Sequence, residues 1–190
     1  DLATYPSPDL LRVLAVLLHQ IATTNDAIRP PSATQDERGR RSGSKSKVHH
    51  PQGVTTAAMG ALGQPSSTLC FHARNVPSIT IESYLLRILK YCPTTNDVFL
   101  SLIVYLDRMS RVAQGSEDGR CFAVDSYNIH RLVIAGVTVA SKFFSDVFYT
   151  NSRYAKVGGL PVHELNQLEL QFLLLNDFRL VIPLPELQSY

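Results

Sequence analysis

Apolar residues recur along the second half of the chain at the three- and four-residue spacing of amphipathic helices. From Leu69 onward this spacing predicts five helical segments, joined by short polar loops. They span residues 79–91, 94–113, 127–146 and 151–157, and a last one from 161 to the prolines at 183 and 185, which are expected to end it. No segment is assigned to a strand, so the pattern predicts an all-α bundle.

Residues typical of helix termini flank these segments. Ser78 is placed to cap the first segment, and Thr94 and Asp97 have the spacing of a capping box at the start of the second. Gly159 follows the fourth segment, where glycine adopts the left-handed conformation that ends many helices. Pro161 begins the fifth segment at its first turn, where proline is tolerated.

The third segment is apolar nearly all round from Leu132 to Ala140. Its many Val and Ile residues also suit a buried strand, and that alternative stays open. The length of the segment, about 20 residues, favours a helix. Small residues at 135, 136 and 140 would let neighbouring helices approach closely, so we expect this helix at the centre of the bundle.

A further amphipathic helix is predicted over residues 9–22, with Ser7 or Asp9 as its N-cap. Its apolar stripe consists of Leu10, Leu14, Leu17 and Leu18. Residues 25–68 are poor in large apolar side chains and rich in Ser, Gly, Pro and charge, so we expect this linker to be mostly disordered. The chain is thus divided into an N-terminal helix (1–24), a linker (25–68) and a helical domain (69–190).

Charge is distributed unevenly. The helical domain has 11 Lys and Arg against 11 Asp and Glu, whereas residues 25–68 have 6 basic and 3 acidic residues. A domain without surplus positive charge disfavours nucleic acid as a partner. The basic run R-G-R-R-S-G-S-K-S-K fits a solvated linker, a nuclear localisation signal or a phosphorylatable loop.

Three widely spaced cysteines, Cys70, Cys92 and Cys121, indicate reduced thiols and an intracellular protein rather than disulfides or a zinc ribbon. The apolar stretch 10–18 is far shorter than the ~20 residues that span a bilayer, so no membrane association is expected.

The stretch Y-A-K-V-G-G-L-P-V-H-E, residues 154–164, is the one place that suggests a catalytic motif. A phosphate-binding loop needs its lysine after the glycines, but Lys156 precedes them. A zinc motif beginning at His163-Glu164 needs a second histidine at position 167, which is glutamine. We therefore expect no cofactor, no metal and no catalysis. An α-helical enzyme whose site cannot be read from the sequence stays as an alternative.

Two charges stand out beside apolar stripes. Lys142 is the only charge between Arg131 and Asp146, and Glu169 borders the stripe of the fifth segment. Such charges extend to solvent, form an internal salt bridge, or meet a partner at the centre of an interface.

The chain resembles the cyclin family. I-V-Y-L-D-R-M is similar to the Y-x-D-R signature of the cyclin box, and A-S-K-F-F and the L-E of L-N-Q-L-E are similar to the next two signatures. T-N-S-R-Y-A-K-V-G-G-L-P-V-H-E-L-N-Q-L-E closely resembles the fungal PHO-type (Pho/Pcl) cyclins. The resemblance covers about residues 69–184.

This resemblance implies one five-helix cyclin box with a central third helix, preceded by an N-terminal helix, that binds and activates a PHO-type cyclin-dependent kinase. Residues that match the family's kinase contacts are Lys142, Phe143, Glu169, Leu173 and Phe178. A kinase inhibitor and a transcription-factor substrate, phosphate signalling, and a nuclear or cytoplasmic location are further implications.

Two further implications concern single residues. Asp107 and Arg108 are expected to serve a structural role inside the box. Asp146 either offers a carboxylate to the kinase arginines that normally gather a phosphothreonine, or is an ordinary solvent-exposed carboxylate. The first helix lacks the M-R-A-I-L sequence of cell-cycle cyclins, so their docking groove is not expected. The alternative to a kinase regulator is a cyclin-like helical adaptor of the transcription machinery.

Overall fold

Helices account for all the regular structure in the residues that the computed structural model describes, which are 4–28, 70–114 and 122–190. This confirms the predicted all-α class. The helices are α1 (Ser7–Ile28), α4 (Ile81–Tyr91), α5 (Asn96–Gln114), α6 (Ile129–Phe144), α7 (Asn151–Gly158), α8 (Val162–Leu175) and α9 (Leu184–Leu187).

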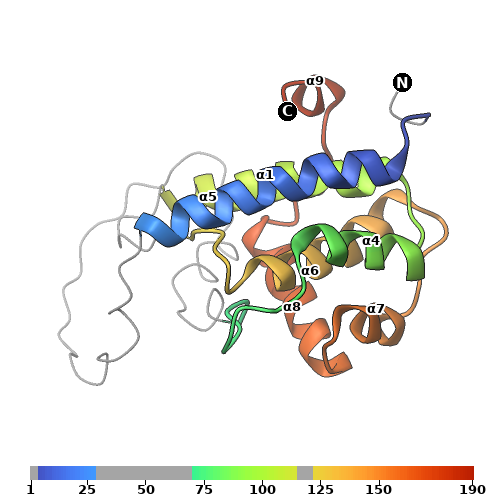
Figure 1. Ribbon diagram of the computed structural model, residues 1–190. Coiled ribbons are helices and arrows are strands. Elements are labelled where there is room, and N and C mark those ends of the chain that lie inside the picture. The colour runs from blue at the N-terminus through green and yellow to red at the C-terminus, as the bar shows by residue number, and fades with distance from the viewer. Residues whose placement is uncertain (1–3, 29–69, 115–121) are drawn as a thin grey trace, which may run out of the picture.

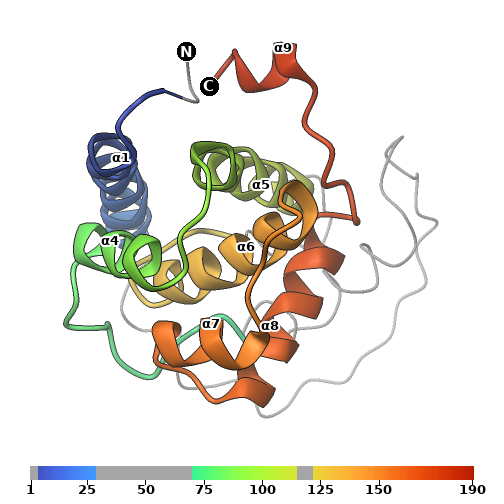
Figure 2. The same ribbon diagram turned by 90° about the vertical axis from the view of Figure 1, so that its right-hand side faces the viewer.

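Helix α6 lies in the middle of the bundle, surrounded by α4, α5, α7 and α8 (Figures 1 and 2). Every side chain from Leu132 to Ser141 is buried. The segment is a helix rather than the strand that its Val and Ile residues also allowed. The buried hydroxyl of Thr138 donates to the Ile134 carbonyl oxygen at 2.7 Å, so this polar group is satisfied within the helix itself.

A glycine permits the close packing of α5, α6 and α8. A Cβ atom added at Gly136 would lie 2.5 Å from Leu102 Cδ2 of α5 and 3.0 Å from the Phe172 ring of α8. Both neighbours are fully buried. The small residue at this position therefore determines how closely the three helices approach, as the sequence predicted.

Helix α1 crosses the bundle along α4 and α5 (Figure 1). The side chains that it buries are Leu11, Leu14, Ala15, Leu18 and Ala22. Leu17, predicted to lie in this stripe, is 37% exposed because it is about 100° around the helix from Leu18. The helix also extends to Ile28, four residues past the predicted boundary at 24. The rest of the predicted linker, residues 29–68, lies outside the described residues.

The last turn of α1 is tied to the loop before α6. The Asn25 Nδ2 donates to the Val124 carbonyl oxygen at 2.8 Å, and the Asp26 carboxylate accepts bonds from the Ser126 amide and hydroxyl. These contacts explain why polar residues assigned to the linker continue the helix.

The predicted helix termini are correct in part. Thr80, not Ser78, caps α4, with its Oγ1 accepting from the Ser83 amide at 3.2 Å. The capping box at Thr94 is not formed, because its buried hydroxyl has no hydrogen-bond partner among the described residues. Gly159 ends α7 with a left-handed φ of 73°, as predicted, and Pro161 directly precedes α8.

The end of α8 was predicted wrongly. The helix ends at Leu175, and the two residues after its C-cap, Asp177 and Phe178, have positive φ angles of 56° and 55°. Pro183 and Pro185 instead begin the short helix α9, where Pro183 is the N-cap. Proline is tolerated at the start of a helix because its missing N–H would have no intrahelical partner there.

Candidate partner-binding surface

Lys142 and Glu169, which are 27 residues apart, meet where the end of α6 lies against α8. The Lys142 Nζ is 2.6 Å from Glu169 Oε1. The other carboxylate oxygen accepts a 2.7 Å hydrogen bond from Asn151 Nδ2 of α7. The internal salt bridge that the sequence allowed is thus present, and it joins three helices.

The ion pair is partly open to solvent. The Lys142 side chain is 32% exposed and that of Glu169 is 16% exposed. Lys142 lies in the last turn of α6, where a positive charge is favourable beside the negative end of the helix dipole. One of the three ammonium N–H donors goes to Glu169, so the pair retains capacity for hydrogen bonds to a partner.

Large apolar side chains lie exposed next to this pair in the sequence and at the end of α8. Phe143 and Phe144 are both exposed and meet edge to face, with ring centroids 5.0 Å apart. Val147 and Phe148 follow in the loop after α6, and Phe178 follows α8. Val147 is 74% exposed and Phe178 54%. Exposed aromatics beside a partly buried ion pair are typical of a protein-binding surface.

The other predicted contacts, Leu173 and Asp146, differ in exposure. Leu173 is partly buried and packs against the core, so it offers only part of its side chain. Asp146 lies in the loop after α6 and is exposed. The prediction omitted Phe144, Val147 and Phe148. The sequence did contain a signal for these three residues. They are large and apolar, they lie at and just beyond the end of a helix, and they do not belong to the apolar stripe of any helix.

The motif at residues 154–164 connects two helices. Lys156 is exposed on α7, and its carbonyl oxygen accepts a 3.4 Å bond from Arg87 of α4. Glu164, in the first turn of α8, forms a salt bridge with Arg131 of α6. His163 is exposed. Among the described residues, no group of three or more His, Cys, Asp and Glu side chains is placed to hold a metal ion.

The described cysteines are not activated nucleophiles. Cys70 and Cys92 are thiols that form no disulfide within the part of the chain that the structure describes. Burial raises the pKa of the Cys70 thiol to about 11 and also raises the pKa of Cys92, so both stay protonated at neutral pH. Cys121 lies outside the described residues. In the ranges that the structure describes, no helix is long and apolar enough to cross a membrane.

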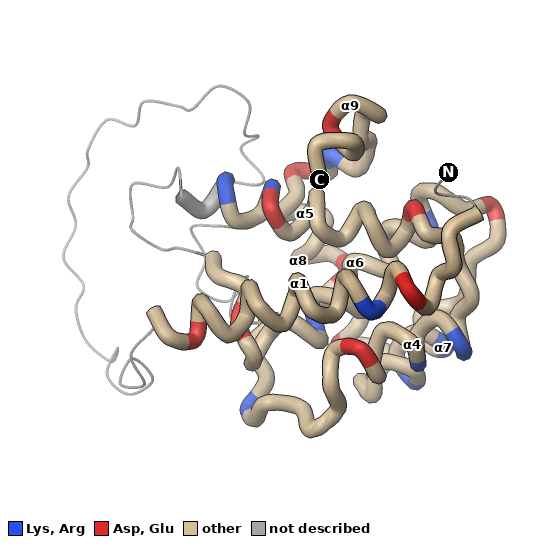
Figure 3. Tube along the Cα trace, turned by 45° about the horizontal axis from the view of Figure 1, so that its top comes forward, with Lys and Arg blue, Asp and Glu red and all other residues tan. Residues whose placement is uncertain are grey.

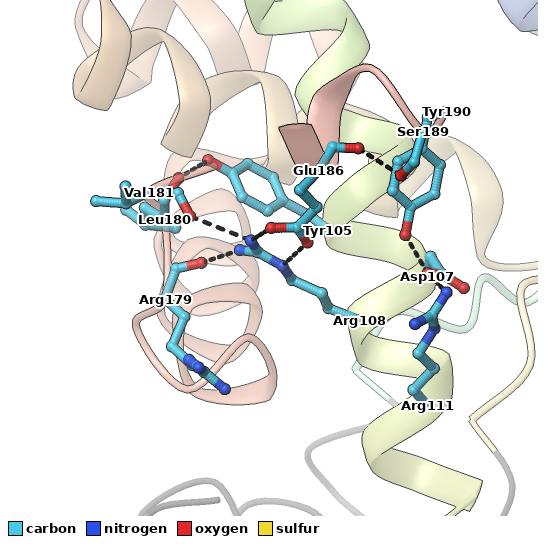
Figure 4. Close-up of polar contacts among 10 residues, drawn as sticks. All are labelled: Tyr105, Asp107, Arg108, Arg111, Arg179, Leu180, Val181, Glu186, Ser189 and Tyr190. Atoms are coloured by element: carbon cyan, nitrogen blue, oxygen red, sulfur yellow. Dashed lines mark hydrogen bonds and ion pairs between the residues drawn. The ribbon is translucent and has the colours of Figure 1, made fainter. Parts of the chain in front are cut away.

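Arg108 of α5 holds the segment that follows α8. We call residues 179–190 the C-terminal strap. The Arg108 Nη1 donates to the Arg179 carbonyl oxygen at 2.6 Å, and Nη2 donates to the Val181 carbonyl oxygen at 3.1 Å. Its Nε and Nη2 also bind the two carboxylate oxygens of Glu186 on α9, at 3.0 and 2.7 Å (Figure 4).

Two tyrosines and Asp107 complete this contact. The buried Tyr105 hydroxyl donates to the Leu180 carbonyl oxygen at 2.7 Å, and burial raises its pKa. The Tyr190 hydroxyl donates to Asp107, which also pairs with Arg111 at 2.8 Å. Burial and the hydrogen bond to Asp107 together raise the pKa of Tyr190 to about 12. Asp107 and Arg108 thus make contacts within the chain, as a structural role would require.

Charged positions of both signs are spread over the helices (Figure 3), in keeping with the balanced charge of the domain. The geometry therefore presents a candidate surface for a protein partner, centred on the Lys142–Glu169 pair and edged by exposed aromatics.

Comparisons with known proteins all point to one family. The family model described as Cyclin matches residues 9–180. The PHO85 cyclin-like protein psl1 of Schizosaccharomyces pombe is 46% identical over the whole chain, which covers 68% of that relative. PHO85 cyclin-7 of Saccharomyces cerevisiae is 45% identical over the whole chain, which covers 61% of it. Cyclin-U4-1 of Arabidopsis thaliana is 47% identical over 54% of the chain and 48% of the relative. The chain thus spans about three fifths to two thirds of the length of the two fungal relatives.

Proposed function

The chain belongs to the cyclin family, and we propose that it is a regulatory subunit that binds and activates a cyclin-dependent kinase of the PHO85 type. The similarity to two fungal PHO85 cyclins over the whole chain supports the type of kinase. The observation that carries the proposal is the partly exposed Lys142–Glu169 pair beside exposed aromatic side chains. In this proposal the catalysis belongs to the kinase.

The kinase contact would be made by Lys142, Phe143, Glu169, Leu173 and Phe178. The ion pair presents both a donor and an acceptor for the backbone and side chains of the kinase's mobile αC helix. Because the pair is already formed, neither charge has to be ordered when the kinase binds. The aromatic side chains would supply the apolar anchors around it, since aromatic residues dominate the energetics of such interfaces.

Activation would be a shift of population. A cyclin that binds the active arrangement of the kinase more tightly than the inactive one raises the active fraction by the ratio of the two affinities. The kinase's lysine–glutamate pair and its metal site then come into register for phosphoryl transfer.

Asp146 belongs to a finer part of the proposal. Its exposed carboxylate, just beyond α6, would pair with the kinase arginines that otherwise gather a phosphothreonine. Activation would then need no phosphorylation of the kinase loop. Asp146→Ala should lower the activity of a complex formed with a non-phosphorylatable kinase. Unchanged activity would leave Asp146 as an ordinary surface carboxylate.

Further parts of the proposal follow from the names of the relatives and from the basic run at 38–47. We infer a role in phosphate-responsive or related signalling, with a kinase inhibitor and a transcription-factor substrate as additional partners. The protein would act in the nucleus, the cytoplasm or both.

A kinase-binding experiment tests the central proposal. Purified PHO85 kinase is titrated onto the immobilised chain and onto the double variant Lys142→Ala/Glu169→Ala. The variant should bind at least tenfold more weakly, because central residues of an interface commonly contribute about 2 kcal/mol or more. Thermal unfolding verifies that the variant is folded.

A matched control is the second ion pair between α6 and α8. Arg131→Ala/Glu164→Ala removes a salt bridge between the same two helices, away from the aromatic surface, and should retain the kinase. If the folded native chain retains no kinase, the hypothesis of a transcription-machinery adaptor takes the place of this proposal.

A further inference from the structure

The chain leaves α8 through a backbone conformation that its residues disfavour. Asp177 and Phe178 both have left-handed φ angles, 56° and 55°. This conformation brings the Cβ atom close to the following carbonyl oxygen, and it is rare for a bulky residue. At the end of α7 the same need is met by Gly159, which has no Cβ.

Burial of the ring does not offset this strain. Phe178 is 54% exposed, so its side chain contributes little to the core. Unfavourable backbone conformations persist only where the surrounding structure holds them. The Asp177 and Phe178 amides donate to the Leu174 and Leu173 carbonyl oxygens, which closes the end of α8 itself. What holds the chain beyond that point must be found in contacts with other helices.

Three successive carbonyl groups directly after Phe178 are bound by α5. The carbonyl oxygens of Arg179 and Val181 accept from Arg108, and the Leu180 carbonyl oxygen between them accepts from Tyr105 (Figure 4). Donors from one rigid helix thus fix the path of the backbone as it leaves position 178.

Arg108 is itself held in place. Its guanidinium group lies between the start of the strap and Glu186 of α9, to which it makes a two-pronged bond. A planar group with several fixed donors can satisfy both sides at once, which a lysine ammonium cannot do in the same geometry. The side chain is only 20% exposed, so these bonds are partly shielded from water.

We infer that Tyr105 and Arg108 are positioning residues that hold Phe178 in its strained, exposed position before a partner arrives. The binding of the partner then does not have to order this aromatic side chain. The inference rests on the proposed function, because it takes Phe178 as a kinase contact. The competing explanation is that the strap only covers the core, against which Leu180 and Ile182 pack.

A double-mutant cycle on kinase affinity separates the two explanations. Arg108→Gln should weaken binding of PHO85 kinase about tenfold when Phe178 is present. In the Phe178→Ala background the same change should have little further effect. Equal losses in both backgrounds would overturn the inference, because Arg108 would then act independently of Phe178.

The matched control is Arg87→Gln. Arg87 also donates to a carbonyl group at a helix end, that of Lys156, but it lies on α4, and within the described structure no hydrogen bond or ion pair joins it to the strap. This variant should bind the kinase with unchanged affinity. A loss as large as that of Arg108→Gln would mean that removal of any such arginine disturbs the surface.

A fluorescence measurement on the chain alone, without kinase, tests whether Arg108 restricts the motion of the side chain at position 178. The chain contains no tryptophan, so Phe178→Trp introduces a single tryptophan, which can be excited selectively over the tyrosines. When Arg108→Gln is added to this variant, the amplitude of fast motion of the tryptophan in time-resolved anisotropy should increase at least twofold. Adding Arg87→Gln instead should leave the amplitude unchanged. Unchanged motion in the Arg108 variant would overturn the inference.

The two measurements distinguish a failure of the proposed function from a failure of this inference. A native chain that binds no kinase overturns the proposed function, while the fluorescence still decides whether Arg108 holds position 178. If Arg108→Gln does not unfold cooperatively, Tyr105→Phe replaces it in both experiments. That variant removes only the Tyr105 hydroxyl, which donates to the Leu180 carbonyl oxygen, and should lower the affinity for the kinase about threefold. An absence of coupling to Phe178 in this variant would likewise overturn the inference.

Discussion

Single residues near the ends of α6 serve different purposes. At its C-terminal end Lys142 joins an ion pair that remains partly exposed. At its N-terminal end His130 is partly buried, with Nε2 bonded to the Ile79 carbonyl oxygen at 2.9 Å and with Nδ1 buried and unpartnered in the described structure. The C-terminal end of α6 therefore presents a charge that a partner can reach, whereas at the N-terminal end the partly buried environment favours the neutral form of His130.

His130 should make stability depend on pH. Burial lowers its pKa below the ordinary value of about 6.5. Below pH 6.5 the unfolded chain binds a proton that the folded chain does not. Stability therefore falls as the pH is lowered toward the folded-state pKa, with a slope of up to about 1.4 kcal/mol per pH unit. Urea unfolding at pH 7.5 and 5.5 measures this loss.

The variant His130→Gln should lack this part of the pH dependence. The other histidines are present in both proteins, so any contribution from them cancels in the difference. Parallel stability profiles for the two proteins would contradict the assignment.

The Lys142–Glu169 pair should also be visible in stability. Lys142→Met leaves the mostly buried Glu169 carboxylate without its cation, and we expect a loss of about 1–2 kcal/mol after allowance for partial exposure. Lys142→Met/Glu169→Leu removes both charges and should recover much of that loss. Thermal unfolding of the two variants compares them, and a double variant less stable than the single one would show that the pair itself is strongly stabilising.

The elements owe their arrangement to contacts between helices rather than to the helices alone. The charge-free middle of α6 is packed from several sides, and its glycine admits Leu102 of α5 and Phe172 of α8. Both α7 and α8 are followed by residues in the left-handed conformation, which is reached in two different ways. Gly159 adopts a left-handed conformation freely, whereas Phe178 requires support from α5. The cost of such a conformation is about 1–2 kcal/mol for a residue with a Cβ.

Gly136→Ala should destabilise the protein although alanine favours helices. The new methyl group would clash with the buried side chains of Leu102 and Phe172, and such overpacking costs about 1–3 kcal/mol. The gain in helix propensity is about 1 kcal/mol. We expect the free energy of unfolding, measured with urea, to fall by up to about 2 kcal/mol. Adding Leu102→Val, which shortens the clashing side chain, should recover part of it, and a further loss would contradict this account.

At the scale of the whole molecule, α1 is part of the same core as the helices that follow residue 70. Its leucines join the hydrophobic core formed with α4 and α5. The match of the cyclin family model also begins in α1, at residue 9. The N-terminal helix, whose docking could not be read from the sequence, therefore packs as part of this core.

Substitutions in α1 should distinguish its two faces. Leu18 is 1% exposed and Leu17, its neighbour, is 37% exposed. Leu18→Ala should lower the free energy of unfolding by about 2–4 kcal/mol, since it leaves a cavity between α1 and the rest of the core. Leu17→Ala should cost less than about 1 kcal/mol. Similar losses in urea unfolding would mean that α1 packs differently.

Periodicity in the sequence was sufficient to predict the class of the fold, the existence of six helices and the central place of α6. These properties depend on which residues lie within a few positions of each other, and the apolar run from Leu132 to Ala140 suits only a buried element. Gly159 was likewise predictable, because the requirement for a left-handed residue at a helix end is local.

Contacts between distant residues determine the rest. The sequence marked Lys142 and Glu169 as unusual, but their 2.6 Å contact depends on how α6 and α8 pack. The path of the chain after α8 depends on the donors that Tyr105 and Arg108 offer from α5, more than 65 residues earlier in the chain. The extension of α1 to Ile28 depends on a loop about 100 residues away. Local pattern carries no information about such partners, since they are brought together only when the helices pack.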